Sequence, residues 1–475
     1  MTNEFSLSTG PITFPPEFGW GVATASYQIE GAVKADGRGQ SIWDTFSHLP
    51  GKILDGTNGD RASDHYNLWR QDVDQLADLG VRYYRFSLAW PRIQPDGRGP
   101  ANQKGLDFYK RLTQRLLDKG IIPWVTLYHW DLPQALEDAG GWPSRDTAQR
   151  LADFGELAFA ALGDQVDHWT TLNEPYCTAF LGYADGEHAP GRQEPAAALA
   201  AMHHLLLGHG LTIERWAAAR RSGQELGITL NFSPPLAPED SDTPEVRDAI
   251  RRYDAIANRA FLNPLVRGEY PADLVQDLAP LTDFGFVREG DMALIAQPMD
   301  ALGVNYYNRL AVLGVDPAVD RFAPGHANVG AADVVTGNRG RPVTGRNWPV
   351  DPEGLIWLTK WLTDNYDLPP LWVTENGSAW EDRIAPDGAV HDPARVAFLE
   401  AHARAIRKIL DLGIDLRGYF VWTPWDNFEW AFGESSRFGL VYVDYETQQR
   451  TEKDSFHWYK ALAASGSIPD DQSEA

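Results

Sequence analysis

The sequence predicts an α/β protein that folds as a single (β/α)8 barrel, with elaborated loops after the strands at the carboxyl-terminal face. Apolar runs typical of buried strands alternate with amphipathic helical patterns along the 475 residues. About eight such units follow one another without a linker, and repeated βα units imply a parallel sheet. Amides, carboxylates and tryptophans stand where the strands stop, which is where such a barrel carries its active site.

The first half of the chain contains four predicted strands separated by helices. The strands are expected at residues 18–29, 81–90, 121–130 and 166–173. Ser63 has the residue type of a helix N-cap, and the helix that follows stops at Gly80. Its apolar face is formed by Tyr66, Trp69, Val73 and Leu76. Further helices are predicted over 144–162 and around Leu106, Tyr109, Leu112 and Leu116.

The second half repeats this alternation. Strands are predicted at 226–232, 302–307, 371–374 and 417–423. Helices are predicted at 196–221, 243–265, 354–365, 394–412 and 456–464. An open doubly wound sheet is the alternative fold, but no Gly-x-Gly-x-x-Gly follows the first strand.

One domain is predicted from residue 14 to 464, after an N-terminal extension over 1–13. Residues 311–347 are rich in Gly, Pro, Asp and Asn and lack periodicity, so they are expected to form a loop over the barrel mouth. The small, acidic segment 465–475 is predicted to be disordered.

Composition narrows the classes of partner. The formal net charge of −24 argues against nucleic acid and against an anionic membrane. Cys177 is the one cysteine, which excludes an intrachain disulfide; we expect it to be an inert buried thiol. The first ten residues are polar, and no run of 18 apolar residues occurs, so neither a secretion signal nor a membrane span is predicted. A cytoplasmic location is expected.

Two glutamates occupy equivalent places at strand ends. Glu174 follows an apolar and threonine-rich run and precedes Pro175, which cannot donate to a sheet ladder. Glu375 follows a similar run and precedes the turn dipeptide Asn376-Gly377. If the barrel brings these strand ends together, two carboxyl groups face one site, an arrangement that suits glycoside hydrolysis.

The other predicted strand ends carry residue types that bind sugars. Amides and carboxylates bind paired hydroxyl groups, and flat aromatic rings cover the C–H faces of a pyranose. These side chains are Gln28, Arg85, His129, Trp130, Asn173, Asn305, Tyr307, Trp422, Glu429 and Trp430. Scattered histidines and the absence of His-Glu-x-x-His argue against a metal site, and no cofactor is predicted.

Six short runs resemble the signatures of glycoside hydrolase family 1, the β-glucosidases and their relatives. They are Phe18–Gln28, Tyr128–Pro133, Asn173–Pro175, Thr374–Gly377, Asp426–Trp430 and Arg437–Leu440. The similarity extends over roughly residues 14–463, and the runs occur in the order that is typical of the family.

The resemblance implies roles for the residues that match. Glu174 would be the acid/base and Glu375 the nucleophile. Gln28, His129, Asn173 and Glu429 would hold the sugar hydroxyls, while Arg85 and Tyr307 would hydrogen-bond the nucleophile. The remaining substrate-binding residues would be Trp130, Asn305, Trp348, Trp422, Trp430 and Phe438, with Trp348 nearer the aglycone. Core packing is the alternative role for the tryptophans, and a structural ion pair is the alternative for Arg85.

Physical chemistry supports the same division of roles. A cationic Arg85 near Glu375 would lower the pKa of that carboxyl group. A charged Glu375 about 5 Å away would raise the pKa of Glu174 by repulsion.

The predicted function is that of a retaining β-glucosidase. It would hydrolyse terminal, non-phosphorylated β-D-glucosides through a covalent glycosyl-enzyme intermediate, with some transglycosylation. Its partner would be a small-molecule β-glycoside or oligosaccharide, and β-galactosides and β-fucosides remain open as substrates. Relatives that cleave 6-phosphoglycosides place Ser at the position of Glu429 and supply Lys and Tyr shortly after it, whereas this chain has Ser436 and Phe438 in that register.

Several alternatives stay open at this stage. They are a non-catalytic sugar-binding barrel, a 6-phospho-β-glycosidase and an inverting hydrolase, which would need carboxyl groups about 6.5–9.5 Å apart. The sequence decides neither the aglycone preference nor the oligomeric state.

Overall fold

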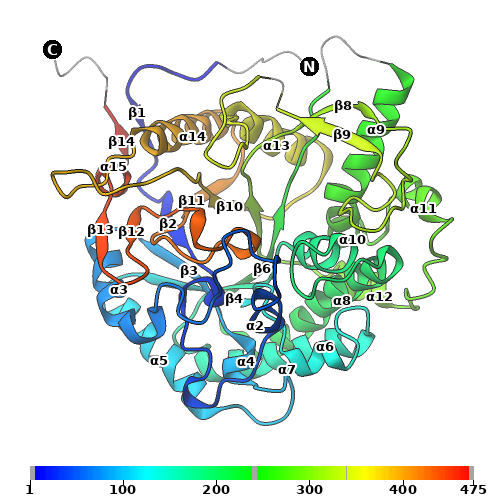
Figure 1. Cartoon of the computed structure of the whole chain (residues 1–475), viewed down its shortest axis with the longest axis horizontal. Helices are drawn as coiled ribbons and strands as arrows, with labels where there is room; N and C mark the ends of the chain where they lie inside the picture. Colours follow the sequence, from blue (N-terminus) through cyan, green and yellow to red (C-terminus); the bar gives the residue numbers. More distant parts are fainter. Residues whose placement is uncertain (1–5, 238–242, 339, 470–475) are drawn as a thin grey trace.

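Eight parallel strands close into a barrel at the centre of the molecule (Figure 1). A computed structural model describes residues 6–237, 243–338 and 340–469. Going around the barrel, the strands are β2 Gly19–Ala23, β3 Tyr83–Ser87, β4 Ile122–Tyr128, β5 His168–Asn173, β6 Glu225–Asn231, β7 Ala301–Asn305, β10 Leu371–Asn376 and β11 Leu416–Trp422. The ring closes where β11 pairs with β2, from Gly418 opposite Gly19 to Trp422 opposite Ala23. The predicted (β/α)8 barrel is confirmed.

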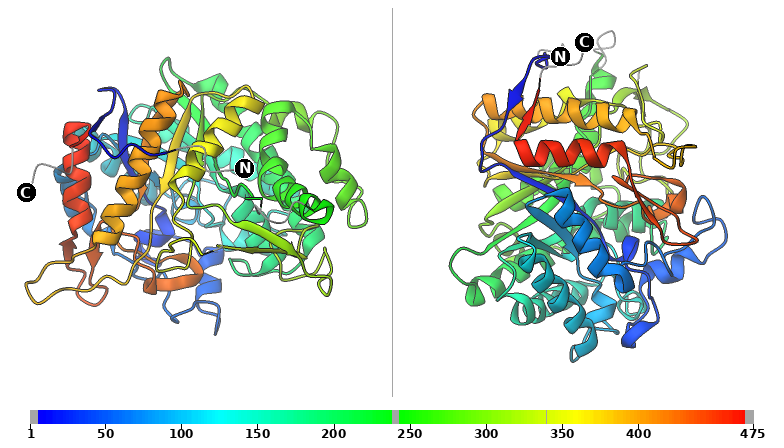
Figure 2. Two further views of the ribbon diagram at one scale, coloured as in Figure 1. Left: turned by 90° about the horizontal axis from the view of Figure 1, so that it is seen from above. Right: turned by 90° about the vertical axis from the view of Figure 1, so that its left-hand side faces the viewer.

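Helices surround this barrel in both views of Figure 2. The main helices after the eight strands are α3 His65–Leu79, α5 Gln103–Asp118, α7 Arg145–Leu162, α8 Pro195–Ala219, α9 Pro244–Asp254, α13 Pro352–Asn365, α14 Pro393–Asp411 and α15 Asp454–Ser465. Among the described residues, α8 is the one helix that is long and apolar enough to span a membrane, but 78% of its most apolar stretch is buried inside the fold.

Aromatic rings fill the barrel away from the strand ends that carry the predicted site. The ring of Trp372 lies 5.0 Å from that of Trp124 and 5.4 Å from that of Tyr83. Gly19 and Gly418 give this indole its space, since a Cβ at Gly418 would lie 2.4 Å from the ring. Glycine inside these two strands is therefore a packing requirement.

Several predicted elements end earlier than the sequence pattern suggested. The predicted strand 18–29 divides into β2 and the short helix α1 Ser26–Ile29, and 81–90 divides into β3 and α4 Trp90–Ile93. Ser63 is not the N-cap of α3. Asp64 takes that position, while the Ser63 hydroxyl donates to the carbonyl of Asp426 in a distant loop. The predicted helix 243–265 is interrupted by a π-helical turn at Ala255–Arg259.

The segment 311–347 contains more order than the predicted loop. Strands β8 Ala311–Val315 and β9 Val334–Gly337 form an antiparallel pair that lies beside α9 (Figure 1). The two strands are short and separated by 18 residues of turns, so no local alternation revealed them.

The two ends of the described chain pair with each other. Strand β14 Ser467–Ile468 runs antiparallel to β1 Ile12–Thr13, and the two strands lie side by side in Figure 1. The apolar side chains of Ile12 and Ile468 are buried. The prediction of disorder from residue 465 is therefore wrong for 465–469. The predicted domain, 14–464, leaves out both strands of this pair. Residues 1–5 and 470–475 lie outside the described part of the chain.

Candidate active site

A cavity of about 460 Å³ opens at the carboxyl ends of the barrel strands. Its volume falls within the range of small-molecule sites, and its wall combines aromatic rings with a few polar groups. Eleven of the side chains predicted for the site line it: His129, Trp130, Glu174, Asn305, Tyr307, Trp348, Glu375, Trp422, Glu429, Trp430 and Phe438. The other three, Gln28, Arg85 and Asn173, hydrogen-bond to residues that line it.

Glu375 stands at the end of β10 with both carboxylate oxygens engaged. The Arg85 guanidinium, from β3, donates to Oε1 at 2.7 Å, and the Tyr307 hydroxyl donates to Oε2 at 3.0 Å. Burial raises the pKa of Glu375, whereas these two donors lower it. Arg85 lowers the pKa of Glu375, as predicted, but burial raises this pKa by more. Because the ion pair favours the charged form, Glu375 is the carboxyl group of the pair that ionises first.

Glu174 lies across the cavity at the end of β5. Its backbone has a φ of +46°, a left-handed conformation that is uncommon for a residue with a side chain. The Asn305 amide donates to Oε1 at 2.6 Å, and the Cys177 thiol donates to Oε2 at 3.1 Å. Burial raises the pKa of Glu174 to about 7, and the charge of Glu375 is the second cause. The predicted repulsion is present, but burial is the larger effect.

Hydrogen bonds fix the orientation of the Asn173 amide and the His129 ring. The Asn173 carbonyl oxygen accepts from Arg85 at 2.6 Å and from Asn305 at 3.1 Å, so its amide nitrogen must face His129. That nitrogen donates to His129 Nε2 at 3.0 Å. Burial lowers the pKa of His129, so the ring is neutral and its proton sits on Nδ1. Among the described residues Nδ1 has no partner, so it is an unpaired donor.

Glu429 lies at the centre of a second cluster of polar side chains. Gln28 Nε2 donates to Glu429 Oε2 at 3.1 Å, and the Trp422 indole nitrogen approaches the same oxygen at 3.4 Å. Gln28 Oε1 is buried without a partner among the described residues. Burial raises the pKa of Glu429 to about 8. Gln28 Oε1 is thus an unpaired acceptor and His129 Nδ1 an unpaired donor, and a polyhydroxylated ligand can pair with both kinds of group.

Aromatic rings enclose the polar groups. Trp130 packs against Trp430 with ring centroids 4.6 Å apart, and Trp422 lies parallel to His129 at 5.8 Å. Trp348, from the segment after β9, contacts Tyr307 at 5.5 Å and Phe438 at 5.9 Å. All five tryptophan and phenylalanine rings therefore contribute packing to the wall while they face the cavity.

Some lining residues were not predicted. They are Cys177, Leu181, Glu187, His188, Asn231, Phe232, Ser233, Asn308, Leu310 and Phe432. The Arg346 guanidinium stacks over the Phe432 ring at 3.8 Å and adds a positive charge that acts on Glu429. Asn231 ends β6, so the argument from strand ends could have found it. The others lie in loops, in the π-helix Cys177–Asp185 or, for Phe432, in the 3-10 helix Trp430–Ser435, where no periodic pattern points to a site. Within the described ranges, no group of three or more His, Cys, Asp or Glu side chains is arranged to hold a metal ion.

Comparison with known proteins agrees with this geometry. The model of glycosyl hydrolase family 1 matches residues 11–467. The chain belongs to glycosyl hydrolase family 1. This confirms the resemblance predicted from the six sequence runs and identifies the chain as a glycoside hydrolase.

Relatives of this family 1 chain match over nearly their whole length. A bifunctional β-D-glucosidase/β-D-fucosidase from Bifidobacterium breve is 46% identical over 462 residues, which are 95% of this chain and 98% of the relative. The crystal structure of the psychrophilic β-glucosidase BglU from Micrococcus antarcticus has a TM-score of 0.91 and 44% identity, with 96% of this chain and 98% of that chain covered. A β-glucosidase from Thermotoga maritima in complex with glucoimidazole has a TM-score of 0.89 and 42% identity, with coverage of 96% and 99%.

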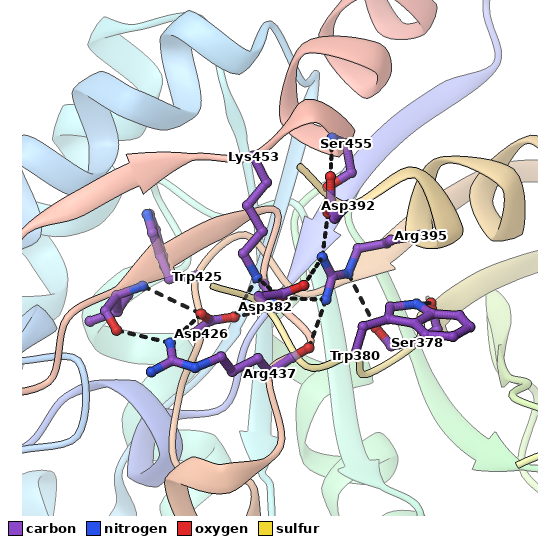
Figure 3. A network of polar contacts seen from close by, with 12 residues as sticks. Ser378, Trp380, Asp382, Asp392, Arg395, Trp425, Asp426, Arg437, Lys453 and Ser455 are labelled. Atoms are coloured by element: carbon purple, nitrogen blue, oxygen red, sulfur yellow. Dashed lines mark hydrogen bonds and ion pairs between the residues drawn. The ribbon is translucent and has the colours of Figure 1, made fainter. Parts of the chain in front are cut away.

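A network of buried charged side chains outside the cavity connects the loops that follow β10 and β11 in this family 1 chain (Figure 3). Asp426, three residues before Glu429, accepts from Lys453 at 2.8 Å and from Arg437 at 2.6 Å. Lys453 also bonds Asp382, in the loop that follows Glu375, and Arg395 donates to Asp382 at 2.7 Å. The loops after β10 and β11 are thereby joined to the start of α15.

Proposed function

We propose that this enzyme is a retaining β-glycosidase that hydrolyses terminal, non-phosphorylated β-D-glucosides. Glu375 is the nucleophile, Glu174 is the acid/base, and transglycosylation is a side reaction. The names of the relatives support a β-glucosidase, and the Bifidobacterium breve relative is named for β-D-fucosidase activity as well. β-Fucosides and β-galactosides are therefore the further substrates to test.

The observation that carries this proposal is the unequal surroundings of two opposed carboxyl groups. Glu375 is paired with a guanidinium, whereas Glu174 receives only neutral donors. The Asn305 amide donates to Glu174, and it also lowers the pKa of Glu375. A shared amide supports the short separation of retaining enzymes, about 5–5.5 Å, over the wider gap that inversion needs.

In the first step, the ionised Glu375 attacks the anomeric carbon while Glu174 protonates the glycosidic oxygen, and the aglycone leaves. Glu375 is then a neutral ester, so its repulsion of Glu174 is gone and the pKa of Glu174 falls. In the second step, Glu174 takes a proton from water, the water attacks the anomeric carbon, and Glu375 is released. If another sugar replaces the water, the same step gives transglycosylation.

The wall of the cavity supplies the groups that hold the sugar. His129 Nδ1 is a free donor and Gln28 Oε1 a free acceptor, so the two present complementary contacts to hydroxyl groups. Glu429 offers the oxygen that Gln28 and Trp422 leave open. Arg85 and Tyr307 serve the nucleophile instead of the sugar.

A leaving-group series tests the roles of the two glutamates. Glu174→Ala removes proton transfer, so hydrolysis of a methyl β-glucoside is expected to fall by about 10²–10⁴-fold, while 2,4-dinitrophenyl β-glucoside still loads Glu375 at close to the wild-type rate. Added azide is expected to give the β-glycosyl azide. An equal loss for both substrates, or an α-azide, would contradict the assignment.

A further inference from the structure

Cys177 contacts Glu174 through both backbone and side chain. It begins the π-helix Cys177–Asp185, three residues after Glu174. Its backbone N–H donates to the Glu174 carbonyl at 2.9 Å, and its thiol donates to Glu174 Oε2 at 3.1 Å. The side chain is buried and lines the active-site cavity. The thiol therefore lies within the site, beside one defined oxygen of the proposed acid/base.

The other oxygen of Glu174 already has a strong donor. Asn305 Nδ2 donates to Oε1 at 2.6 Å. The amide cannot turn around, because its carbonyl oxygen accepts from the Thr374 hydroxyl at 2.8 Å and its nitrogen also donates to Asn173. A proton on Oε1 would point at this N–H group, so the carboxyl proton belongs on Oε2.

We propose that Cys177 is a positioning residue for the acid/base: its thiol donates to Glu174 Oε2 and, together with Asn305 on Oε1, fixes the carboxyl group so that Oε2 carries the transferred proton. This inference rests on the proposed role of Glu174. It assigns no bond-forming step to the sulfur.

A thiol suits this position better than a hydroxyl group would. Burial raises the pKa of the Cys177 thiol well above its usual value, so the group stays protonated and remains a donor. The S–H group is a weak donor, and it stabilises the charged form of Glu174 less than an O–H group would. Glu174 therefore keeps the raised pKa of about 7 that a proton donor needs near neutral pH.

The first test compares the pH dependence of kcat/KM for 4-nitrophenyl β-glucoside in the wild type, Cys177→Ser and Cys177→Ala. The hydroxyl of the serine variant is expected to move the upper limb of the profile down by about 0.5 pH unit, and loss of the donor in the alanine variant to move it up by a similar amount. Thr178→Ala, a neighbouring buried site on the same helix, is the matched control and should leave the limb in place. An unmoved limb in both Cys177 variants would overturn the proposal.

The Glu174→Ala variant separates this proposal from the proposed function. If Glu174 is the acid/base, its upper limb disappears in that variant, and an unmoved limb in the Cys177 variants then refutes only the role of the thiol. If the limb persists in Glu174→Ala, the role of Glu174 itself is refuted.

A measurement on the unmodified protein covers the case in which a Cys177 variant does not fold. The chain has one cysteine, so its infrared S–H stretching band belongs to Cys177 alone. As pH rises through the titration of Glu174, the carboxylate becomes a stronger acceptor and the band is expected to move to lower frequency. The band should stay in place in Glu174→Gln. A band that does not respond to pH in the wild type would contradict the contact.

Discussion

At the scale of single residues, the atoms around their carboxyl groups give the two central glutamates different roles. Both are buried at strand ends, which the sequence pattern indicated. Arg85 beside Glu375 was also predicted, from the resemblance to glycoside hydrolase family 1. The thiol on Glu174 was not, because the turn that brings Cys177 back depends on a left-handed backbone at Glu174 that no sequence periodicity indicates.

A single residue, Glu429, leads us to predict discrimination against 6-phosphorylated substrates. We expect 4-nitrophenyl β-glucoside 6-phosphate to be cleaved at least about 100-fold more slowly than the unphosphorylated glucoside, since the family resemblance assigns the buried carboxyl group of Glu429 to that end of the sugar. Parallel kcat/KM measurements at pH 7 check this.

Arg346 provides the control for that comparison, because it is a cation near Glu429 that the sequence argument overlooked. Arg346→Gln should leave cleavage of the unphosphorylated glucoside nearly unchanged. Comparable rates for the two substrates in the wild type, lost in Arg346→Gln, would show that this guanidinium binds the phosphate and would overturn the prediction.

At the scale of elements, the site depends on the loops after β10 and β11, which a buried charge network connects. The strands and helices were predictable because their apolar periodicity is local. The end of α3 at Gly80 was predictable as well, but its start was not, because a tertiary partner sets it: Ser63 leaves the cap position and bonds the carbonyl of Asp426 instead. The charge network around Lys453 was equally hidden, since its members come from four separate segments (Figure 3).

The network predicts a large stability effect from one substitution. Lys453→Met leaves Asp382 and Asp426 buried with less compensating charge, so we expect a loss of about 3–5 kcal/mol in the free energy of unfolding. Lys460→Met is the control, because Lys460 pairs with Asp78 on the surface and its loss should cost about 0–1 kcal/mol. Urea denaturation of both variants measures the difference. Similar midpoints for the two would show that the network does not stabilise the fold.

At the scale of the whole molecule, the barrel brings residues that are far apart in sequence to one end. Eight strands in chain order place Glu174, directly after β5, and Glu375, on β10, around one cavity. The number and order of the strands were predictable from the alternation of units. The pairing of β1 with β14 was not, because two-residue strands at opposite ends of the chain carry no pattern of their own.

The most direct test of the account is the intact mass of the enzyme after incubation with 2,4-dinitrophenyl 2-deoxy-2-fluoro-β-glucoside, followed by peptide mapping. The fluorine slows both steps, whereas the good leaving group still lets the first one proceed. We expect one added fluorosugar per chain, on the peptide that contains Glu375. An adduct on another residue, or no adduct while the unfluorinated 2,4-dinitrophenyl glucoside is still cleaved, would contradict Glu375 as the nucleophile of a retaining β-glucosidase.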